Sequence, residues 1–128
     1  MYQSLDLFQT AGAMARHAGQ RQAVVARNIA NADTPGYRAQ QIAPFSDTYG
    51  AQAAIPLRHS RPGHIAGEPA MMSPARITDA PAEGSPNGNT VSLEEELLAS
   101  VAVAREQSRA LAIYRHGMTV LRTALGRG

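Results

Sequence analysis

Residues 24–38 read Val-Val-Ala-Arg-Asn-Ile-Ala-Asn-Ala-Asp-Thr-Pro-Gly-Tyr-Arg, and a helical pattern ends within them. Pro35 lacks a backbone amide and biases Thr34 toward extended geometry. Gly36 offers the positive φ that the third position of a type II turn requires. Thr34, Pro35, Gly36 and Tyr37 therefore predict a sharp turn with a fixed exit direction.

The residues before this turn predict one long helix. Residues 2–32 contain no proline, and apolar or small residues recur every three or four positions. Asn28 and Asn31 lie in the last turns, where their amides can bond freed carbonyls or adopt the left-handed cap. The periodic face consists of Leu5, Phe8, Ala11, Ala15, Ala18, Gln22, Val25 and Ile29.

Small residues lie beside that face. Gly12, Gly19 and Ala26 would let the backbone of a partner helix approach closely. An ordinary amphipathic helix and an assembly helix share this pattern, so both interpretations stay open.

A second helix is predicted to begin at Ser92. The sequence Ser-Leu-Glu-Glu is a capping box, in which the Ser92 hydroxyl accepts from the third helical amide and Glu95 reaches back. Glu94, Glu95 and Glu96 place negative charge at the positive end of the helix dipole, and the arginines follow later. Gly126 closes the far end.

Two heptad series in this helix predict coiled-coil-like packing in an antiparallel hairpin with the N-terminal helix. The first consists of Leu97, Ala104, Leu111, Met118 and Leu125, and the second of Leu93, Ser100, Gln107, Tyr114 and Leu121. Polar residues such as Ser100 and Gln107 interrupt this seam, and they suit a position that faces another subunit or fixes the register.

The middle of the chain cannot be a long helix, because all eight prolines lie within residues 35–86. A short helix is predicted within residues 43–54, and short extended pieces at 55–57 or 75–78. We expect one mainly α domain with an N-terminal axial helix at 1–34, a Pro/Gly-rich irregular region at 35–91 and a C-terminal axial helix at 92–128.

The composition limits how the chain can be stabilised. Of its 128 residues 44% are hydrophobic, but 24 of these are alanine, while Phe occurs twice and Trp never. Large side chains for a free-standing core are therefore scarce. We expect long helices that complete their burial against other copies or partners.

Charge and cysteine content exclude several classes of protein. The twelve basic residues are all arginine, and they are scattered from Arg16 to Arg127 without interleaved aromatics, so nucleic-acid binding is not expected. The absence of cysteine excludes disulfides and thiolate sites. No apolar stretch reaches membrane-spanning length and no signal-peptide pattern opens the chain, so these features alone favour the cytoplasm.

No residue pattern predicts catalysis, a metal site or a cofactor. Serine never occurs in a Gly-x-Ser-x-Gly context, and no phosphate-binding glycine loop or paired carboxylates in a cleft are recognisable. His59 and His64 form the only close histidine pair, and Glu68 is the one further ligand nearby, so a metal is not expected. His17 and His116 are lone helical residues, expected at the surface or an interface.

Three segments resemble the bacterial flagellar rod and hook family. Residues 21–39, RQAVVARNIANADTPGYRA, are similar to its N-terminal signature, and residues 87–97, NGNTVSLEEEL, to the segment that opens its C-terminal helix. Residues 59–65, HSRPGHI, resemble a loop of the proximal-rod members. The resemblance covers the chain in order, and it assigns as motif positions Asn28, Asn31, Thr34, Pro35, Gly36 and Tyr37.

The resemblance implies a structural subunit of the proximal rod in the flagellar basal body, assembled helically around the export channel through its terminal helices. The implied partners are copies of the chain, other proximal-rod proteins, a FliE-type adaptor and the flagellar export gate, without nucleic acid or a membrane span. It also implies export without a cleaved signal peptide, through the flagellum's own type III apparatus, to a periplasmic rod.

Two alternatives stay open. The sister proximal-rod protein FlgC shares the N-terminal signature, although the short length and residues 33–39 and 89–97 favour a different proximal-rod member. From another class, a free-standing helical adaptor or a nucleic-acid-binding hairpin would fold in isolation, whereas a rod subunit should gain helix on assembly.

Overall fold

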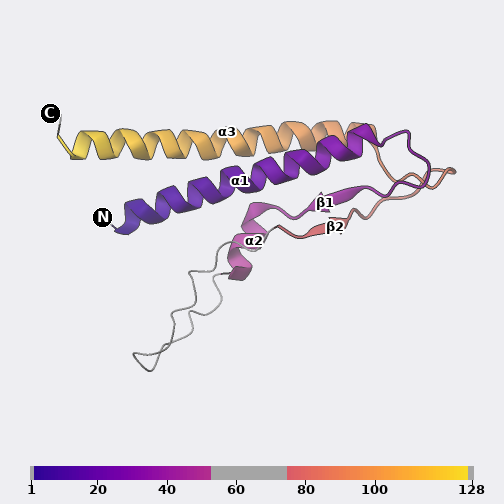
Figure 1. Ribbon diagram of the computed structural model, residues 1–128, viewed down its shortest axis with the longest axis horizontal. Helices are drawn as coiled ribbons and strands as arrows, with labels where there is room; N and C mark the ends of the chain where they lie inside the picture. The colour runs from indigo at the N-terminus through magenta and orange to yellow at the C-terminus, as the bar shows by residue number, and fades with distance from the viewer. Residues whose placement is uncertain (1, 53–74, 127–128) are drawn as a thin grey trace, which may run out of the picture.

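The computed structural model describes residues 2–52 and 75–126. Helix α1 (Tyr2–Ala30) and helix α3 (Leu93–Ala124) lie side by side in opposite directions, so the start of α1 and the end of α3 share one end of the hairpin (Figure 1). This confirms the predicted mainly α fold, in which two long terminal helices pack against each other.

Helix α1 continues for 29 residues and ends at Ala30. The amide of Asn31 bonds the carbonyls of both Arg27 and Asn28 at 3.1 Å, which tightens the last turn. Residues 31–36 then form turns, so the helix is shorter than the predicted range 1–34.

Helix α3 is 32 residues long and begins after Ser92, whose hydroxyl accepts a hydrogen bond from the Glu95 amide at 3.5 Å. Three glutamates occupy its first turn, where they stabilise the positive end of the dipole. Gly126, with φ of 73°, follows its C-terminal end.

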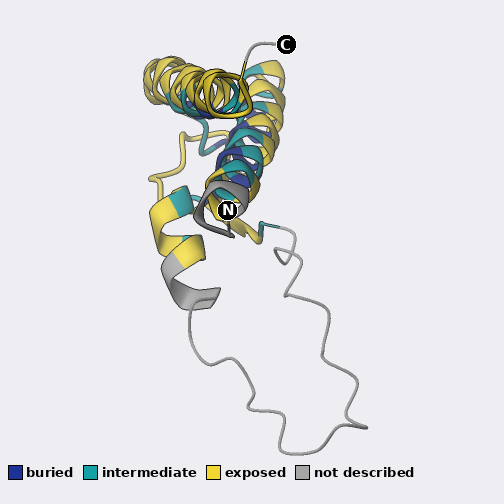
Figure 2. Cartoon of the chain, turned by 90° about the vertical axis from the view of Figure 1, so that its left-hand side faces the viewer, coloured by how far each residue is buried: buried dark blue, intermediate teal, exposed yellow. Residues whose placement is uncertain are grey.

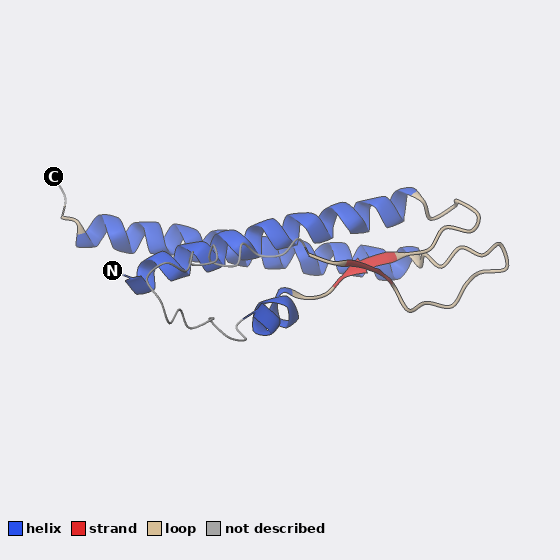
Figure 3. Ribbon diagram, turned by 60° about the horizontal axis from the view of Figure 1, so that its bottom comes forward, coloured by secondary structure: helices blue, strands red, loops and turns tan. Residues whose placement is uncertain are grey.

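A short arm lies along α1. It consists of strand β1 (Gln40–Ile42), helix α2 (Phe45–Gln52) and strand β2 (Ile77–Asp79), and the strands pair antiparallel with Gln41 opposite Thr78 (Figures 1 and 3). Helix α2 falls within the predicted residues 43–54, and β2 overlaps the predicted piece at 75–78. Strand β1 was not predicted. The predicted piece at 55–57, together with His59 and His64, lies outside the described residues.

The core is a thin layer of small side chains between the two long helices. Ala11, Ala18 and Val25 of α1 are buried there, as are the α3 residues Val103 and Ala110 (Figure 2). A second buried layer lies between α1 and the arm and contains His17, Val24, Asn28, Ala39 and Ile42. Helix α1 is therefore covered on two sides, and α3 on one.

The seam of the hairpin on α3 lies one residue before the first predicted heptad series. Val103, Ala110 and Gly117 are buried, whereas Leu97, Ala104, Leu111 and Leu125 are exposed and Met118 is half-buried. Small residues suit this contact because the helices approach closely. A Cβ at Gly117 would lie 3.0 Å from the ring of Phe8, which packs edge-on against Tyr114 at 5.2 Å.

Within residues 2–52 and 75–126, none of the helices α1, α2 and α3 is both long enough and apolar enough to cross a bilayer.

Candidate functional site

The family-motif residues meet at the turn where α1 ends. Gly36 has φ of 72°, and the Tyr37 amide donates to the Thr34 carbonyl at 3.2 Å, as in a type II turn with Pro35 at its second position. The backbone therefore leaves α1 in the fixed direction that leads into β1.

Asn28 is fully buried at the centre of this junction. Its Nδ2 donates at 2.7 Å to the Gln40 carbonyl and at 2.7 Å to Oε1 of Glu96 in α3. Its Oδ1 accepts from the Gln40 amide at 3.1 Å and from the Tyr37 hydroxyl at 3.2 Å. One amide side chain thus joins α1, the turn, β1 and the start of α3.

Asn31 and Thr34 have local roles at the helix end. The Asn31 side chain donates to the Arg27 carbonyl at 2.8 Å, and the Thr34 hydroxyl donates to Oδ1 of Asn31 at 3.2 Å. These bonds satisfy groups that a helix end leaves without intrahelical partners. Both bonds are exposed.

Asn89 holds the turn from a distant part of the sequence. It is 3% exposed, and its Nδ2 donates to the carbonyls of Asn31, Ala32 and Thr34 at 3.0, 2.8 and 2.8 Å. Its Oδ1 accepts from the Val91 amide at 2.7 Å. Sequence reasoning placed Asn89 in a family segment without a role, because capping across 58 positions leaves no local pattern.

Two glycines make this contact possible. Gly88 has φ of 81°, and a Cβ at that position would lie 3.4 Å from the Cα of Gly36. The Gly36 amide donates to the Asn87 carbonyl at 3.0 Å. The two turns are therefore in backbone contact, and each constrains the other.

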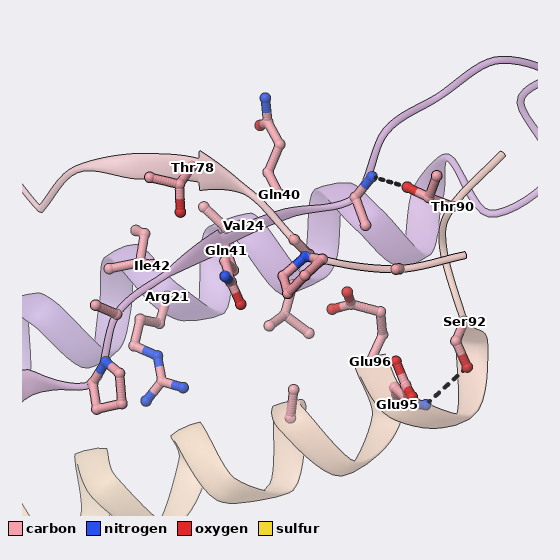
Figure 4. A pocket seen from close by; sticks show the side chains of 18 of the residues that line it. Arg21, Val24, Gln40, Gln41, Ile42, Thr78, Thr90, Ser92, Glu95 and Glu96 are labelled. Carbon is pink, nitrogen blue, oxygen red and sulfur yellow. Dashed lines mark hydrogen bonds between the residues drawn. The ribbon is translucent and has the colours of Figure 1, made fainter. Parts of the chain in front are cut away.

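An open groove of about 560 Å³ lies beside the junction, between α1, the arm and the start of α3 (Figure 4). Arg21, Gln41, Glu95 and Glu96 contribute its polar lining, and Val24 is among its apolar residues. The Glu95 side chain therefore faces the groove, while its amide donates to the predicted cap Ser92.

Burial shifts the pKa of the Glu96 carboxyl. Removal from water raises the pKa, the hydrogen bond from Asn28 opposes this, and the neighbouring charge of Glu95 raises it further. The buried amide–carboxylate bond therefore has its full strength only when Glu96 is ionised.

Among the described side chains, three polar contacts cross from α1 to α3. Nη1 of Arg21 lies 2.8 and 2.7 Å from the two carboxylate oxygens of Glu106, and Nε2 of Gln22 donates to the Ser100 hydroxyl at 3.3 Å. The bond from Asn28 to Glu96 is the third. Ser100, which appeared to interrupt the seam, is bonded within the hairpin.

His17 is fully buried between α1 and α2 of its own chain, which corrects the expectation of a position at the surface or an interface. Its ring packs edge-on against Phe45 at 5.6 Å, and neither ring nitrogen has a hydrogen-bond partner among the described residues. Burial and the charge of Arg21 lower its pKa, while the charge of Glu106 and the backbone of Ala43 oppose this without forming a bond of good geometry. The lowered pKa favours the neutral form of the His17 imidazole.

The geometry of this junction is that of a structural joint. Its buried amides form hydrogen bonds to backbone groups and to one carboxylate, and these bonds hold the segments together. Within the described ranges, no three His, Asp or Glu side chains gather as metal ligands would.

The chain is similar to known proteins of one structural class. The family described as flagella basal body rod protein matches residues 9–38, which span most of α1 and the turn. The chain is also 31% identical over 109 residues to a protein of Agrobacterium fabrum, covering 81% of each chain. The chain therefore belongs to the flagellar basal body rod protein family.

Within that family the similarity is to FlgB. The Agrobacterium fabrum relative is flagellar basal body rod protein FlgB. FlgB of Salmonella typhimurium is 36% identical over 88 residues, covering 60% of this chain and 62% of the relative. These relatives favour FlgB over the sister protein FlgC.

Proposed function

We propose that the chain is a structural subunit of the proximal rod in the flagellar basal body. Family membership makes it a structural rod component of the basal body. The proximal position is our inference from the similarity to FlgB and from the sequence segments that resemble proximal-rod proteins.

The observation that carries the proposal is the joint at the end of α1. The family match covers a helix and the turn that ends it, and Asn28 and Asn89 bind that turn to the arm and α3. A subunit of a rod needs a rigid angle between the axial helices and the segment that leaves them. Residues 1–34 and 92–128 would then form the axial part, and residues 35–91 the part outside it.

The exposed apolar side chains of α3 support assembly through the terminal helices. Leu98, Val101 and Val120 are 72%, 51% and 51% exposed in the single chain. Exposed apolar residues in such number along one helix favour burial against a neighbour. We propose copies of the chain, other proximal-rod proteins, a FliE-type adaptor and the export gate as partners, and a non-enzymatic role.

Deletion of the gene tests the proposal. We expect cells without the protein to be non-motile and to lack the rod in electron micrographs of their basal bodies, and the wild-type gene to restore both. Intact rods in the deletion strain would contradict it. Circular dichroism distinguishes a rod subunit from the alternative of a free-standing helical adaptor, because such an adaptor would not gain helix when rod proteins assemble.

A further inference from the structure

Asn87 is the one asparagine of the chain that precedes a glycine, and both Asn87 and Gly88 are exposed. In such a pair the glycine amide nitrogen can attack the side-chain carbonyl carbon of the asparagine, because no side chain on the glycine hinders the approach. The other asparagines, Asn28, Asn31 and Asn89, precede residues with side chains. Among the asparagines, residue 87 is therefore the most open to spontaneous chemical change.

This change needs only water. The Gly88 amide gives up its proton and its nitrogen bonds to Cγ of Asn87, while the bond from Cγ to Nδ2 breaks and ammonia leaves with that proton. Water then opens the resulting succinimide ring. Attack of water at Cγ gives aspartate, whereas attack at the main-chain carbonyl carbon gives isoaspartate, in which the backbone continues through Cγ and the main-chain carbon becomes a carboxylate.

The folded chain holds the peptide group between Asn87 and Gly88 from both sides, where two turns meet at one end of the hairpin (Figure 1). Its N–H donates to the Ser85 carbonyl at 2.8 Å, across a β-turn that has the favoured Pro86 at its second position. Its carbonyl accepts from the Gly36 amide at 3.0 Å. Closing the ring requires a rotation of this peptide group, and that rotation breaks both bonds.

The same turn opposes loss of the Gly88 proton. Without it, the nitrogen would face the Ser85 carbonyl oxygen at 2.8 Å as an anion, with no proton to share. The side chain is held as well, since Oδ1 of Asn87 accepts from the Asn89 amide at 3.0 Å. The Asn89 side chain is in turn bonded to three carbonyls at the end of α1. The joint therefore decides whether the reactive atoms can meet.

We propose that Asn87 is a modification site that the closed joint keeps unreactive, and that it converts to isoaspartate in chains whose joint stays open. Reaction then requires local opening of the two turns or unfolding of the whole chain. This chemistry does not depend on the proposed function in the rod.

Isoaspartate at position 87 prevents the joint from closing again. It adds one carbon atom to the backbone between Cα of residue 87 and the nitrogen of Gly88. The two backbones are closely packed here, since a Cβ at Gly88 would lie 3.4 Å from Cα of Gly36. The carbonyl that accepts from the Gly36 amide is also replaced by a charged side branch. A chain that stays unfolded for long is thereby marked and kept from forming the native joint.

Incubation of the whole chain at mildly alkaline pH, in buffer and in guanidinium chloride, tests the protection. Peptide mass spectrometry follows conversion of the residue 87 amide to an acid, and chromatography separates isoaspartate from aspartate. A synthetic peptide of residues 84–91 in both solutions corrects for the effect of the denaturant on the chemistry itself. We expect conversion at least about thirtyfold slower in the folded chain, because two hydrogen bonds must first break. Equal corrected rates would overturn the proposal.

Two variants open the joint in buffer. Asn89→Ala removes the bonds that anchor the turn to α1, and it should speed the conversion of Asn87 at least about tenfold. Asn31→Ala is the matched control, because its side chain makes only exposed bonds at the helix end, and it should keep the wild-type rate. Equal rates in these two chains would show that the joint gives no protection.

Gly36→Ala covers the case in which Asn89→Ala does not fold. A Cβ at Gly36 meets no atom within 4 Å, but φ of 72° strains the turn. Because Gly36 is remote from Asn87 in sequence, this change cannot alter the local reactivity of the pair. It should still speed the conversion, and an unchanged rate would overturn the role of the second turn.

Refolding of the converted chain tests the consequence. Chains with isoaspartate at position 87 should unfold at a lower urea concentration than the wild type. Asn87→Asp carries the same charge without the additional backbone atom, and its Oδ1 can still accept from the Asn89 amide, so it should unfold near the wild-type midpoint. A converted chain that refolds to wild-type stability would overturn the proposed effect on the joint. The gene deletion still decides the proposed function, so the two can fail separately.

Discussion

Replacement of Asn28 by Asp tests whether the buried amide joins the hairpin to the arm. The change keeps the shape of the side chain and turns the donor Nδ2 into an oxygen. That atom lies 2.7 Å from the Glu96 carboxylate, so two negative charges would face each other. At an effective dielectric constant of about 20 their repulsion is about 6 kcal/mol.

The two carboxylates can avoid this repulsion by binding one proton, which costs less free energy than the repulsion itself. The cost of binding the proton therefore limits the loss of unfolding free energy. At about pH 7.5 the cost is about 4 kcal/mol, since each unit above an ordinary carboxyl pKa of about 4.3 contributes about 1.4 kcal/mol. The Gln40 carbonyl also loses its donor, which adds about 1 kcal/mol. We expect the unfolding free energy to fall by about 5 kcal/mol in total at about pH 7.5 and by about 2 kcal/mol at about pH 5.

The assay is urea unfolding followed by far-ultraviolet circular dichroism, with sucrose present to raise the starting stability. Asn31→Asp is the control, because its side chain is bonded only to its own helix end and should lose less than about 1 kcal/mol. Adding Glu96→Gln to Asn28→Asp should recover most of the loss, since the new amide can donate to Asp. An equal loss at both pH values would refute the reasoning.

Three further predictions follow from the junction and its surroundings. Because burial lowers the His17 pKa, the folded chain binds fewer protons than the unfolded one. The unfolding free energy should therefore be greatest above about pH 6.5 and fall below it; His17→Leu should remove this slope in urea titrations, and His116→Leu should keep it. Gly36→Val should lower the unfolding free energy by about 2 kcal/mol or more, because valine is strained at φ of 72°, and it should abolish motility. Gly19→Val should not disturb the turn. Normal swimming of the Gly36→Val strain would contradict the importance of the turn. Asn89→Ala should lower the unfolding free energy by about 2–4 kcal/mol, because it leaves buried backbone groups unsatisfied; a loss under about 1 kcal/mol would show that water replaces the amide.

The long helices could be predicted because each is an uninterrupted periodic run bounded by strong end signals. Ser92 and Gly36 specify a start and a turn locally, and the structure gives both residues those conformations. The short pieces of the arm were harder. Strand β1 has three residues, and its pairing with β2 depends on a partner 35 or more positions away.

The position of the seam could not be chosen from the heptads alone. Two neighbouring series run along α3, and the bulky one, with Leu97 and Leu111, seemed better suited to a core. The hairpin uses the small series with Val103 and Ala110, because α1 presents its own alanines and the pair packs closely. His17 was misplaced for a similar reason, since the arm that covers it is remote in sequence.

The alanine-lined seam has a consequence for how the hairpin holds its alignment. Ala11 and Ala18 lie one heptad apart, as do Val103 and Ala110, so sliding one helix by seven residues would bring like against like at little loss of apolar contact. The polar pairs do not repeat in this way: Arg21 with Glu106, and Asn28 with Glu96, each have one matching position. These polar pairs therefore prevent the two helices from sliding past each other. In a rod built from such hairpins, they would keep the length of every subunit constant.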